Sequence, residues 1–261
     1  MSMLLAIDIG NTHTVIGVFS PDRLLAEWRI SSSTRRTLDE TWHLVKSFLV
    51  DSSIDPVALT HVGVASVVPD LTSTYEAIAS KFLRTQAYVI DGTAEVGMQL
   101  LVHDPSTVGA DRLCNAVAGF AKYGGPLIVI DLGTATTYDV IDASGNYLGG
   151  AIALGLESEA AELHRRAAKL PKIELRFPPS VIGKETVSSM QAGVMYSAVD
   201  AIEGMVRRIR SEMGKPLRVI ATGGLSSVVA PYCPSIEHTE PSLVLDGIRL
   251  LCERAGHLPA R

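Results

Sequence analysis

The stretch LLAIDIGNTHTVIGVF, residues 4–19, has a counterpart in LIVIDLGTATTYDVID, residues 127–142. In both segments an apolar run ends in Asp-x-Gly, hydroxyl or amide residues follow, and a second stretch rich in Thr, Val and Ile comes next, so that Asp8 aligns with Asp131. Apolar runs interrupted by a Gly-containing turn predict two strands joined by a tight connection. Their repetition predicts an internal duplication in which each half opens on the same strand pair.

A third strand and then alternating helices and strands follow each strand pair. Apolar residues at helical spacing, such as Leu38, Trp42 and Val45, predict helices, and short apolar runs predict buried strands. We therefore expect an α/β protein with the order βββαβαβα in each half, divided into domains 1–122 and 123–261 with a cleft between them. The expected later strands are 23–30, 61–67, 86–90, 147–153 and 217–221, and the expected helices are 37–50, 69–83, 108–122, 156–170, 186–213 and 243–254.

Composition restricts the class of protein. The 261 residues are 47% hydrophobic and 20% charged, which excludes disordered, collagen-like and coiled-coil chains. The net charge of −5 supplies no positive field to hold nucleic acid or an anionic membrane, so neither partner is expected. No apolar run approaches the roughly 20 residues of a membrane span, and the first residues reach Asp8 too early for a signal peptide. Three scattered cysteines fit no disulfide framework or zinc site, and a cytoplasmic location is expected.

The two Asp-x-Gly turns are the first candidate sites. Gly10 and Gly133 lack a Cβ, so that backbone amides there can approach an anion. Asp8 and Asp131 would be tolerated beside bound phosphates where they hold a cation such as Mg2+. One such turn is often no more than a turn, but two matching turns indicate a phosphate clamp. The glycine patterns of P-loops and of dinucleotide-binding folds do not occur in the sequence. Further donors in the two turns are Asn11, Thr12, Thr134, Thr136 and Thr137.

A third constellation is Gly109-Ala110-Asp111-Arg112, which follows a turn-like segment at 103–106 and begins a predicted helix. Arg112 can hold an anionic substrate group, and Asp111 can accept a proton from a hydroxyl. The same residues can also be an ordinary helix start, with Asp111 near the positive end of the dipole, and spacing alone favours that interpretation. Thr222-Gly223-Gly224 likewise either admits a nucleotide to the backbone or is only a turn.

Taken together, these segments resemble the type III pantothenate kinases in order and spacing over nearly the whole chain. That family belongs to the superfamily of acetate and sugar kinases, Hsp70 and actin, so the resemblance implies a duplicated actin-like (ribonuclease H-like) fold. It also implies ATP-dependent phosphorylation of the primary hydroxyl of pantothenate to 4'-phosphopantothenate, the first step of coenzyme A biosynthesis. The matching segments are DIGNT (8–12), GADR (109–112), DLGTATT (131–137), GGAI (149–152), GKET (183–186), MQAG (190–193) and TGG (222–224).

The resemblance also implies roles for individual residues. Asp8 would lie near Mg2+, through water, and Asp131 would bind the monovalent cation, K+ or ammonium, that the family requires. Asp111 would be the proton acceptor. Thr186 would reach the substrate site across the interface of a homodimer. The implied ATP contacts are Asp8, Ile9, Gly10, Asn11, Thr12, His13, Thr14, Val15 and Thr134, and the implied pantothenate contacts are Gly109, Ala110, Asp111, Arg112 and Thr186.

Two other functions stay open on the sequence alone. One is a phosphotransferase of the same superfamily acting on a sugar or acyl acceptor, against which the GADR segment argues. The other is a non-catalytic accessory or regulatory protein with this fold, against which the presence of Asp8, Asp111 and Asp131 and the acidic pI of 5.8 argue. Leu154 and Val102 depart from the family pattern, which has Pro and Tyr at these places.

Overall fold

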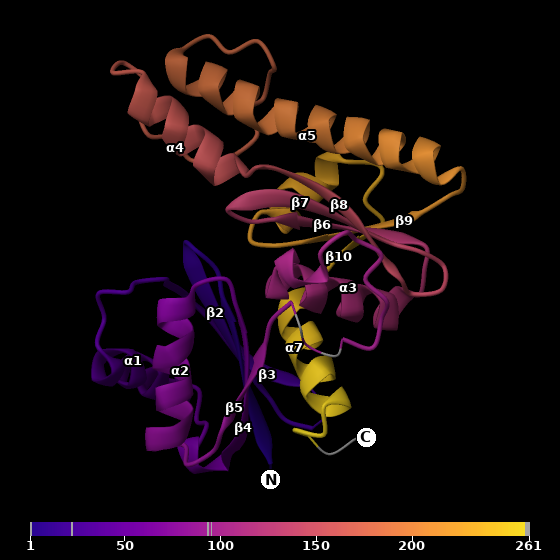
Figure 1. Ribbon diagram of the computed structural model, residues 1–261. Coiled ribbons are helices and arrows are strands. Elements are labelled where there is room, and N and C mark those ends of the chain that lie inside the picture. Colours follow the sequence, from indigo (N-terminus) through magenta and orange to yellow (C-terminus); the bar gives the residue numbers. More distant parts are fainter. Residues whose placement is uncertain (1, 22, 93, 95, 259–261) are drawn as a thin grey trace. The chain divides into compact units, whose positions relative to one another are not determined.

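The computed structural model describes residues 2–21, 23–92, 94 and 96–258 (Figure 1). Contacts group the chain into two compact units, Met1–Ala118 with Leu243–Arg261, and Gly119–Ser242. The expected division at 122 follows the duplication along the chain, whereas the compact units follow packing in space. The two differ because the terminal helix packs on strands of the first unit.

The first unit is built on a five-stranded sheet with the order β3-β2-β1-β4-β5. The first three strands form an antiparallel meander, and the last two are parallel to β1, so that the carboxyl ends of three strands meet at one edge. The strands are β1 (Met3–Ile9), β2 (His13–Phe19), β3 (Leu24–Ser31), β4 (Leu59–Ser66) and β5 (Ala87–Ile90), and the helical segments are α1 (Leu38–Asp51), η1 (Pro56–Ala58), α2 (Pro69–Phe82), η2 (Pro105–Thr107), α3 (Ala110–Tyr123) and α7 (Leu243–Arg254). The last residues of α3, from Gly119 on, belong to the second unit.

Helices cover both faces of this sheet, as Figure 1 shows. Ile7, Ile9 and Ile16 pack with apolar residues of α1 and α2 in one buried cluster. On the other face, α7 approaches the strands at two glycines. A Cβ on Gly17 would lie 2.7 Å from Leu245, and one on Gly63 would lie 2.6 Å from Ile248 and from Cys252. The absence of side chains at these two positions is therefore what lets α7 lie directly on the sheet.

The second unit repeats the arrangement with the order β10-β9-β6-β7-β8. Its first three strands again form an antiparallel meander, and β9 is parallel to β6. Leu156 of α4 and Val194 and Ile202 of α5 belong to one buried cluster with Ile128 and Ile130 of the sheet. The strands are β6 (Leu127–Leu132), β7 (Ala135–Ile141), β8 (Tyr147–Leu154), β9 (Arg218–Thr222) and β10 (His238–Thr239), and the helical segments are α4 (Leu156–Arg166), α5 (Thr186–Met213), α6 (Ser226–Val229) and η3 (Ala230–Tyr232).

The expected order βββαβαβα is confirmed in the first half of the chain. The second half follows it with one additional helix, since α4 and α5 both come between β8 and β9. Helix α4 ends at Arg166 rather than at the expected 170, and the backbone of Ala167 is already extended. Among the described residues, no helix combines the length and the apolar character that crossing a membrane requires.

Candidate active site

The first Asp-x-Gly turn connects β1 to β2 and leaves Asn11 and Thr12 exposed. The Gly10 amide donates to the His13 carbonyl at 3.0 Å, which closes the turn. Ser32, directly after β3, holds the turn in place. Its amide donates to the Thr12 carbonyl at 2.8 Å, and its hydroxyl donates to the Gly10 carbonyl at 2.6 Å.

The predicted ATP contacts of this turn differ in exposure. Asn11 and Thr12 are exposed, and Ile9, Thr14 and Val15 are buried in the sheet. The others, Asp8, Gly10 and His13, are partly exposed. The Thr14 hydroxyl shares a hydrogen bond of 2.9 Å with the Ser32 hydroxyl. Side chains buried in this way fix the conformation of the turn and are not accessible to a ligand. A ligand at the turn can contact only its backbone and its exposed side chains, Asn11 and Thr12 among them. Sequence analysis missed Ser32, which lies outside the motif.

The GADR segment lies at the same edge of the first sheet. Asp8 pairs with Ala65 near the end of β4, and the Val67 amide donates to the Ile9 carbonyl at 3.1 Å. A Cβ on Gly109 would lie 3.7 Å from Val67 and would collide with the Asp111 carboxylate. A side chain at position 109 would therefore displace the Asp111 carboxylate, which folds back over the start of α3.

Asp111 occupies the first turn of α3, where the Arg112 amide donates to its Oδ1 at 2.8 Å. Burial raises the pKa of Asp111, and the Arg112 amide and guanidinium only partly oppose that effect. Burial also raises the pKa of the Cys114 thiol well above its usual value, with the charges of Asp8 and Asp111 adding to the effect. Both carboxylates therefore lie within electrostatic reach of the same buried thiol. Asp8 at the end of β1 and Asp111 in the first turn of α3 thus both act on the pKa of Cys114.

The turn-like segment before α3 lies at the carboxyl end of β5. Asp104 accepts hydrogen bonds from the Ser106 amide at 3.0 Å and from the Ser106 hydroxyl at 2.6 Å. Gly92, directly after β5, lies against this loop, and a Cβ there would be 2.5 Å from the Ser106 carbonyl oxygen. The first turn, the GADR segment and this loop thus share one edge of the sheet, the usual place for ligands in α/β proteins.

The second Asp-x-Gly turn is held by the beginning of α4. The Gly155 amide and the Ser158 hydroxyl both donate to the Thr134 carbonyl, at 3.1 and 2.8 Å. A Cβ on Gly155 would collide with the Gly133 carbonyl, so the helix can start this close to the turn only with glycine there. The Thr134 side chain remains exposed above the turn.

The Thr222-Gly223-Gly224 segment packs directly on Asp131. Strand β9 pairs with β6 so that Thr222 lies opposite Asp131. Gly223 has a φ of 88°, and a Cβ there would collide with the Asp131 carboxylate and lie 2.7 Å from the Leu132 nitrogen. A Cβ on Gly133 would lie 3.4 Å from the same carboxylate. The backbone of Gly223 therefore lies directly against the Asp131 carboxylate, and no side chain at that position occupies the space beside its Oδ1.

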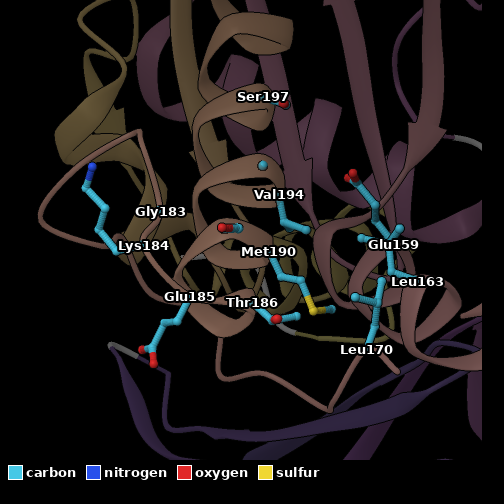
Figure 2. Close-up of a pocket in the computed structure, with 12 residues that line it drawn as sticks. Glu159, Leu163, Leu170, Gly183, Lys184, Glu185, Thr186, Met190, Val194 and Ser197 are labelled. Atoms are coloured by element: carbon cyan, nitrogen blue, oxygen red, sulfur yellow. The ribbon is translucent and has the colours of Figure 1, made fainter. Parts of the chain in front are cut away.

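Thr186 lies in a different part of the second unit. It begins α5 and lines an open groove of about 600 Å³ together with Glu159 and Leu163 of α4 (Figure 2). Met190 and Val194 on α5 contribute apolar side chains to the groove. The structure thus gives Thr186 a lining position in this groove, which faces solvent.

Comparison with known proteins identifies the family. The profile of type III pantothenate kinases matches residues 4–208. A type III pantothenate kinase of Myxococcus xanthus (strain DK1622) is 44% identical over 252 residues, covering 97% of this chain and 98% of that protein. One of Moorella thermoacetica (strain ATCC 39073 / JCM 9320) is also 44% identical, covering 97% and 99%.

Solved structures support the fold. The inorganic polyphosphate/ATP-glucomannokinase from Arthrobacter sp. strain KM aligns with a TM-score of 0.52 and 16% identity over 99% of this chain and 100% of that chain. These structural alignments confirm the expected duplicated actin-like fold, which such sugar kinases have. Together with the sequence match to the profile, these comparisons show that the chain belongs to the type III pantothenate kinase family.

Proposed function

We propose that this protein transfers the γ-phosphate of ATP to the primary hydroxyl of pantothenate, forming 4'-phosphopantothenate in the first step of coenzyme A biosynthesis. Membership of the kinase family supports the reaction. The observation that carries it is Asp111, a carboxylate of raised pKa at the same sheet edge as the first phosphate turn. A carboxylate with a raised pKa is a stronger base than an ordinary one, as proton abstraction from an alcohol requires.

Each neighbouring group has a role in this proposal. Asp111 accepts the hydroxyl proton while the oxygen attacks the γ-phosphorus, the bond from the γ-phosphorus to the β,γ-bridging oxygen breaks, and ADP leaves. Arg112 pairs with the pantothenate carboxylate. The amides of the turn at 8–15 and of Thr134 contact the ATP phosphates. Asp8 would hold Mg2+ through water, and the ion would supply positive charge that offsets the charge of the phosphates. Among the described residues no group of three or more His, Cys, Asp or Glu side chains is arranged to hold a metal ion.

Asp131 is the proposed site of a monovalent cation, K+ or ammonium. The residues fit such an ion because the glycines at 133 and 223 leave space next to the carboxylate, which a Cβ at either position would reduce or fill. One carboxylate together with backbone and hydroxyl oxygens is a donor set for a hard cation of low charge. The positive charge would offset repulsion between Asp131 and the ATP phosphates.

We also propose a cytoplasmic homodimer with the substrate site near its interface, to which Thr186 contributes. Ile152 and Leu154 on β8 are 65% and 59% exposed, and such apolar exposure on a strand favours a protein contact. In this proposal residues 1–122 carry the first phosphate turn and the substrate loop, and residues 123–261 carry the second turn and the adenosine side. Nucleic acid and membrane have no part in it.

The test is ADP release by the purified protein with ATP, Mg2+ and pantothenate, in parallel K+, ammonium and Na+ buffers of equal ionic strength. Pantothenate-dependent release that needs K+ or ammonium is the expected result. Release with a sugar or acyl acceptor but not with pantothenate would overturn the substrate assignment. No release with any acceptor, from folded protein, would favour a non-catalytic role.

A further inference from the structure

Strand β7 carries a carboxylate that the proposed reaction does not use. Asp139 is completely buried, and two hydroxyls donate to it. Thr137 Oγ1 donates to its Oδ2 at 3.1 Å, and Tyr147 Oη donates to its Oδ1 at 2.6 Å. Burying a carboxylate costs free energy even when hydrogen bonds satisfy it, so packing alone does not favour Asp at this position.

The register of the sheet connects Asp139 to Asp131. Thr137 on β7 lies directly opposite Asp131 on β6, so their side chains leave the sheet on the same face. Opposed residues of this kind have Cβ atoms roughly 5 Å apart. Side chains alternate along a strand, so Thr137 and Asp139 also share that face. A row of polar groups thus runs from Asp131 at the edge of the sheet through Thr137 to the buried Asp139.

The first unit shows that the fold does not require this row. There the residue opposite Asp8 is Val15, and the next position on the same face is Gly17. Both are apolar, in a meander with the same strand order and direction as that of the second unit. The polar pair Thr137 and Asp139 is therefore particular to the half of the molecule that contains Asp131.

The proton of the Thr137 hydroxyl decides what this row can bind. A hydroxyl has one proton, and the hydrogen bond to Asp139 uses it. The lone pairs of Thr137 Oγ1 that remain point away from Asp139. The residue opposite Thr137 is Asp131, whose carboxylate oxygens are also acceptors. Two acceptor oxygens on adjacent positions form a favourable arrangement when a cation lies between them.

We propose that Asp139 is a positioning residue for a monovalent-cation site formed by Asp131 and Thr137. It does not touch the ion. By accepting the Thr137 proton, it keeps the Thr137 oxygen available to the cation, and its own charge adds to the attraction. This inference rests on the proposed assignment of K+ or ammonium to Asp131.

The experiment measures cation preference in two ways. The first is the rise in melting temperature when K+ replaces Na+ at constant ionic strength, with ADP and Mg2+ present. The second is the K+ concentration that gives half-maximal ADP release. Asp139→Asn and Thr137→Val are the test variants, and Tyr147→Phe is the matched control because it removes a donor to Asp139 but leaves the Thr137 hydrogen bond.

We expect each test variant to need about tenfold more K+, the change that corresponds to losing one charge-assisted interaction. The K+-dependent rise in melting temperature should shrink in parallel, and the KM for pantothenate should stay close to that of the wild type. Tyr147→Phe should melt at a lower temperature and keep the K+ preference. Because Asp139 acts through Thr137, the double variant should lose little more than Thr137→Val alone.

Other outcomes would overturn the inference. A folded Asp139→Asn protein with an unchanged K+ response would do so, as would additive losses in the double variant. If Asp139→Asn does not fold, an unchanged K+ response in Thr137→Val would overturn the inference. Wild-type protein that phosphorylates pantothenate without preferring K+ over Na+ would overturn the cation assignment and this inference together. A K+-dependent rise in melting temperature without activity on pantothenate would instead overturn the proposed reaction and leave the cation site standing.

Discussion

Among single residues, Asp111 bears the proposed chemistry, and Asp111→Asn tests it directly. The amide has nearly the same size but cannot accept the hydroxyl proton, so we expect turnover to fall by about 10² to 10⁴, the usual contribution of a general base. Equilibrium titration should show ATP binding largely unchanged. Asp70 in the first turn of α2 is the matched control, since Asp70→Asn makes the same change at an equivalent helix position. Near wild-type turnover in Asp111→Asn would remove Asp111 from the mechanism.

The raised pKa of Asp111 also predicts a pH-dependent effect on stability. A carboxyl whose pKa rises on folding binds its proton more tightly in the folded state, so the ionised form lowers the free energy of unfolding at neutral pH. We therefore expect Asp111→Asn to melt at a higher temperature than the wild type at about pH 7.5. The difference should shrink as the pH falls through the raised pKa and vanish below about 4, the ordinary value for Asp. A difference that does not change with pH would contradict the burial argument.

At Gly223, a left-handed backbone conformation coincides with a close approach to the backbone of a neighbouring strand. With a φ of 88° and the Asp131 carboxylate in the way of any Cβ, Gly223→Ala should lower the free energy of unfolding by more than the roughly 1 to 3 kcal/mol that strain alone costs. Gly214, with a φ of 63° and open space around an added Cβ, is the control for strain without collision. Denaturant unfolding compares the two variants. If substitution at Gly223 and at Gly214 lowers the free energy of unfolding equally, the collision with Asp131 adds nothing to the cost of backbone strain.

Between elements, the first phosphate turn depends on the residue that follows β3. Ser32→Ala removes side-chain hydrogen bonds to Gly10 and Thr14, each worth about 1 kcal/mol. We expect lower stability and a higher KM for ATP, because the turn at 10–12 loses its anchor. Ser31→Ala, one position earlier and exposed, is the matched control. If the KM for ATP is equal in both variants, the hydrogen bond from the Ser32 amide to the Thr12 carbonyl is sufficient to hold the turn.

The helices show how far periodicity alone reaches. α5 and α7 have the bounds expected from the sequence, because their apolar residues recur over several turns. α6, with four residues, and β10, with two, were not predicted, since neither is long enough to show a period. β10 exists because the chain runs along β9, where the backbone amides of Glu237 and Glu240 donate to the carbonyls of Val219 and Ala221.

For the whole molecule, the position of α7 gives a prediction about shortened chains. Leu243, Leu245, Ile248 and Leu251 are fully buried, and burying four such side chains contributes roughly 6 to 12 kcal/mol. That is comparable with the stability of an entire domain, about 5 to 15 kcal/mol. A chain ending at Ser242 should therefore fail to fold its first unit.

Amide hydrogen exchange tests this expectation strand by strand. In the chain ending at Ser242, the amides of β1 and β4 should lose protection. A chain ending at Gly256 retains α7 and should keep these amides protected. Protected β1 amides without α7 would mean that α1, α2 and α3 suffice for the core of the first unit.

The duplication, the two Asp-x-Gly turns and the family resemblance can all be read from the printed sequence, because each depends on residue types at short, regular spacing. Most helices and strands follow from the same local patterns. Contacts between distant segments are different, since no local pattern encodes them. Folding places Ser32 on the first turn, Gly223 on Asp131 and α7 on the first sheet, and the surroundings of Asp111 raise its pKa. Burial and close approach depend on what the rest of the chain packs around a residue, and these properties therefore arise only in the folded protein.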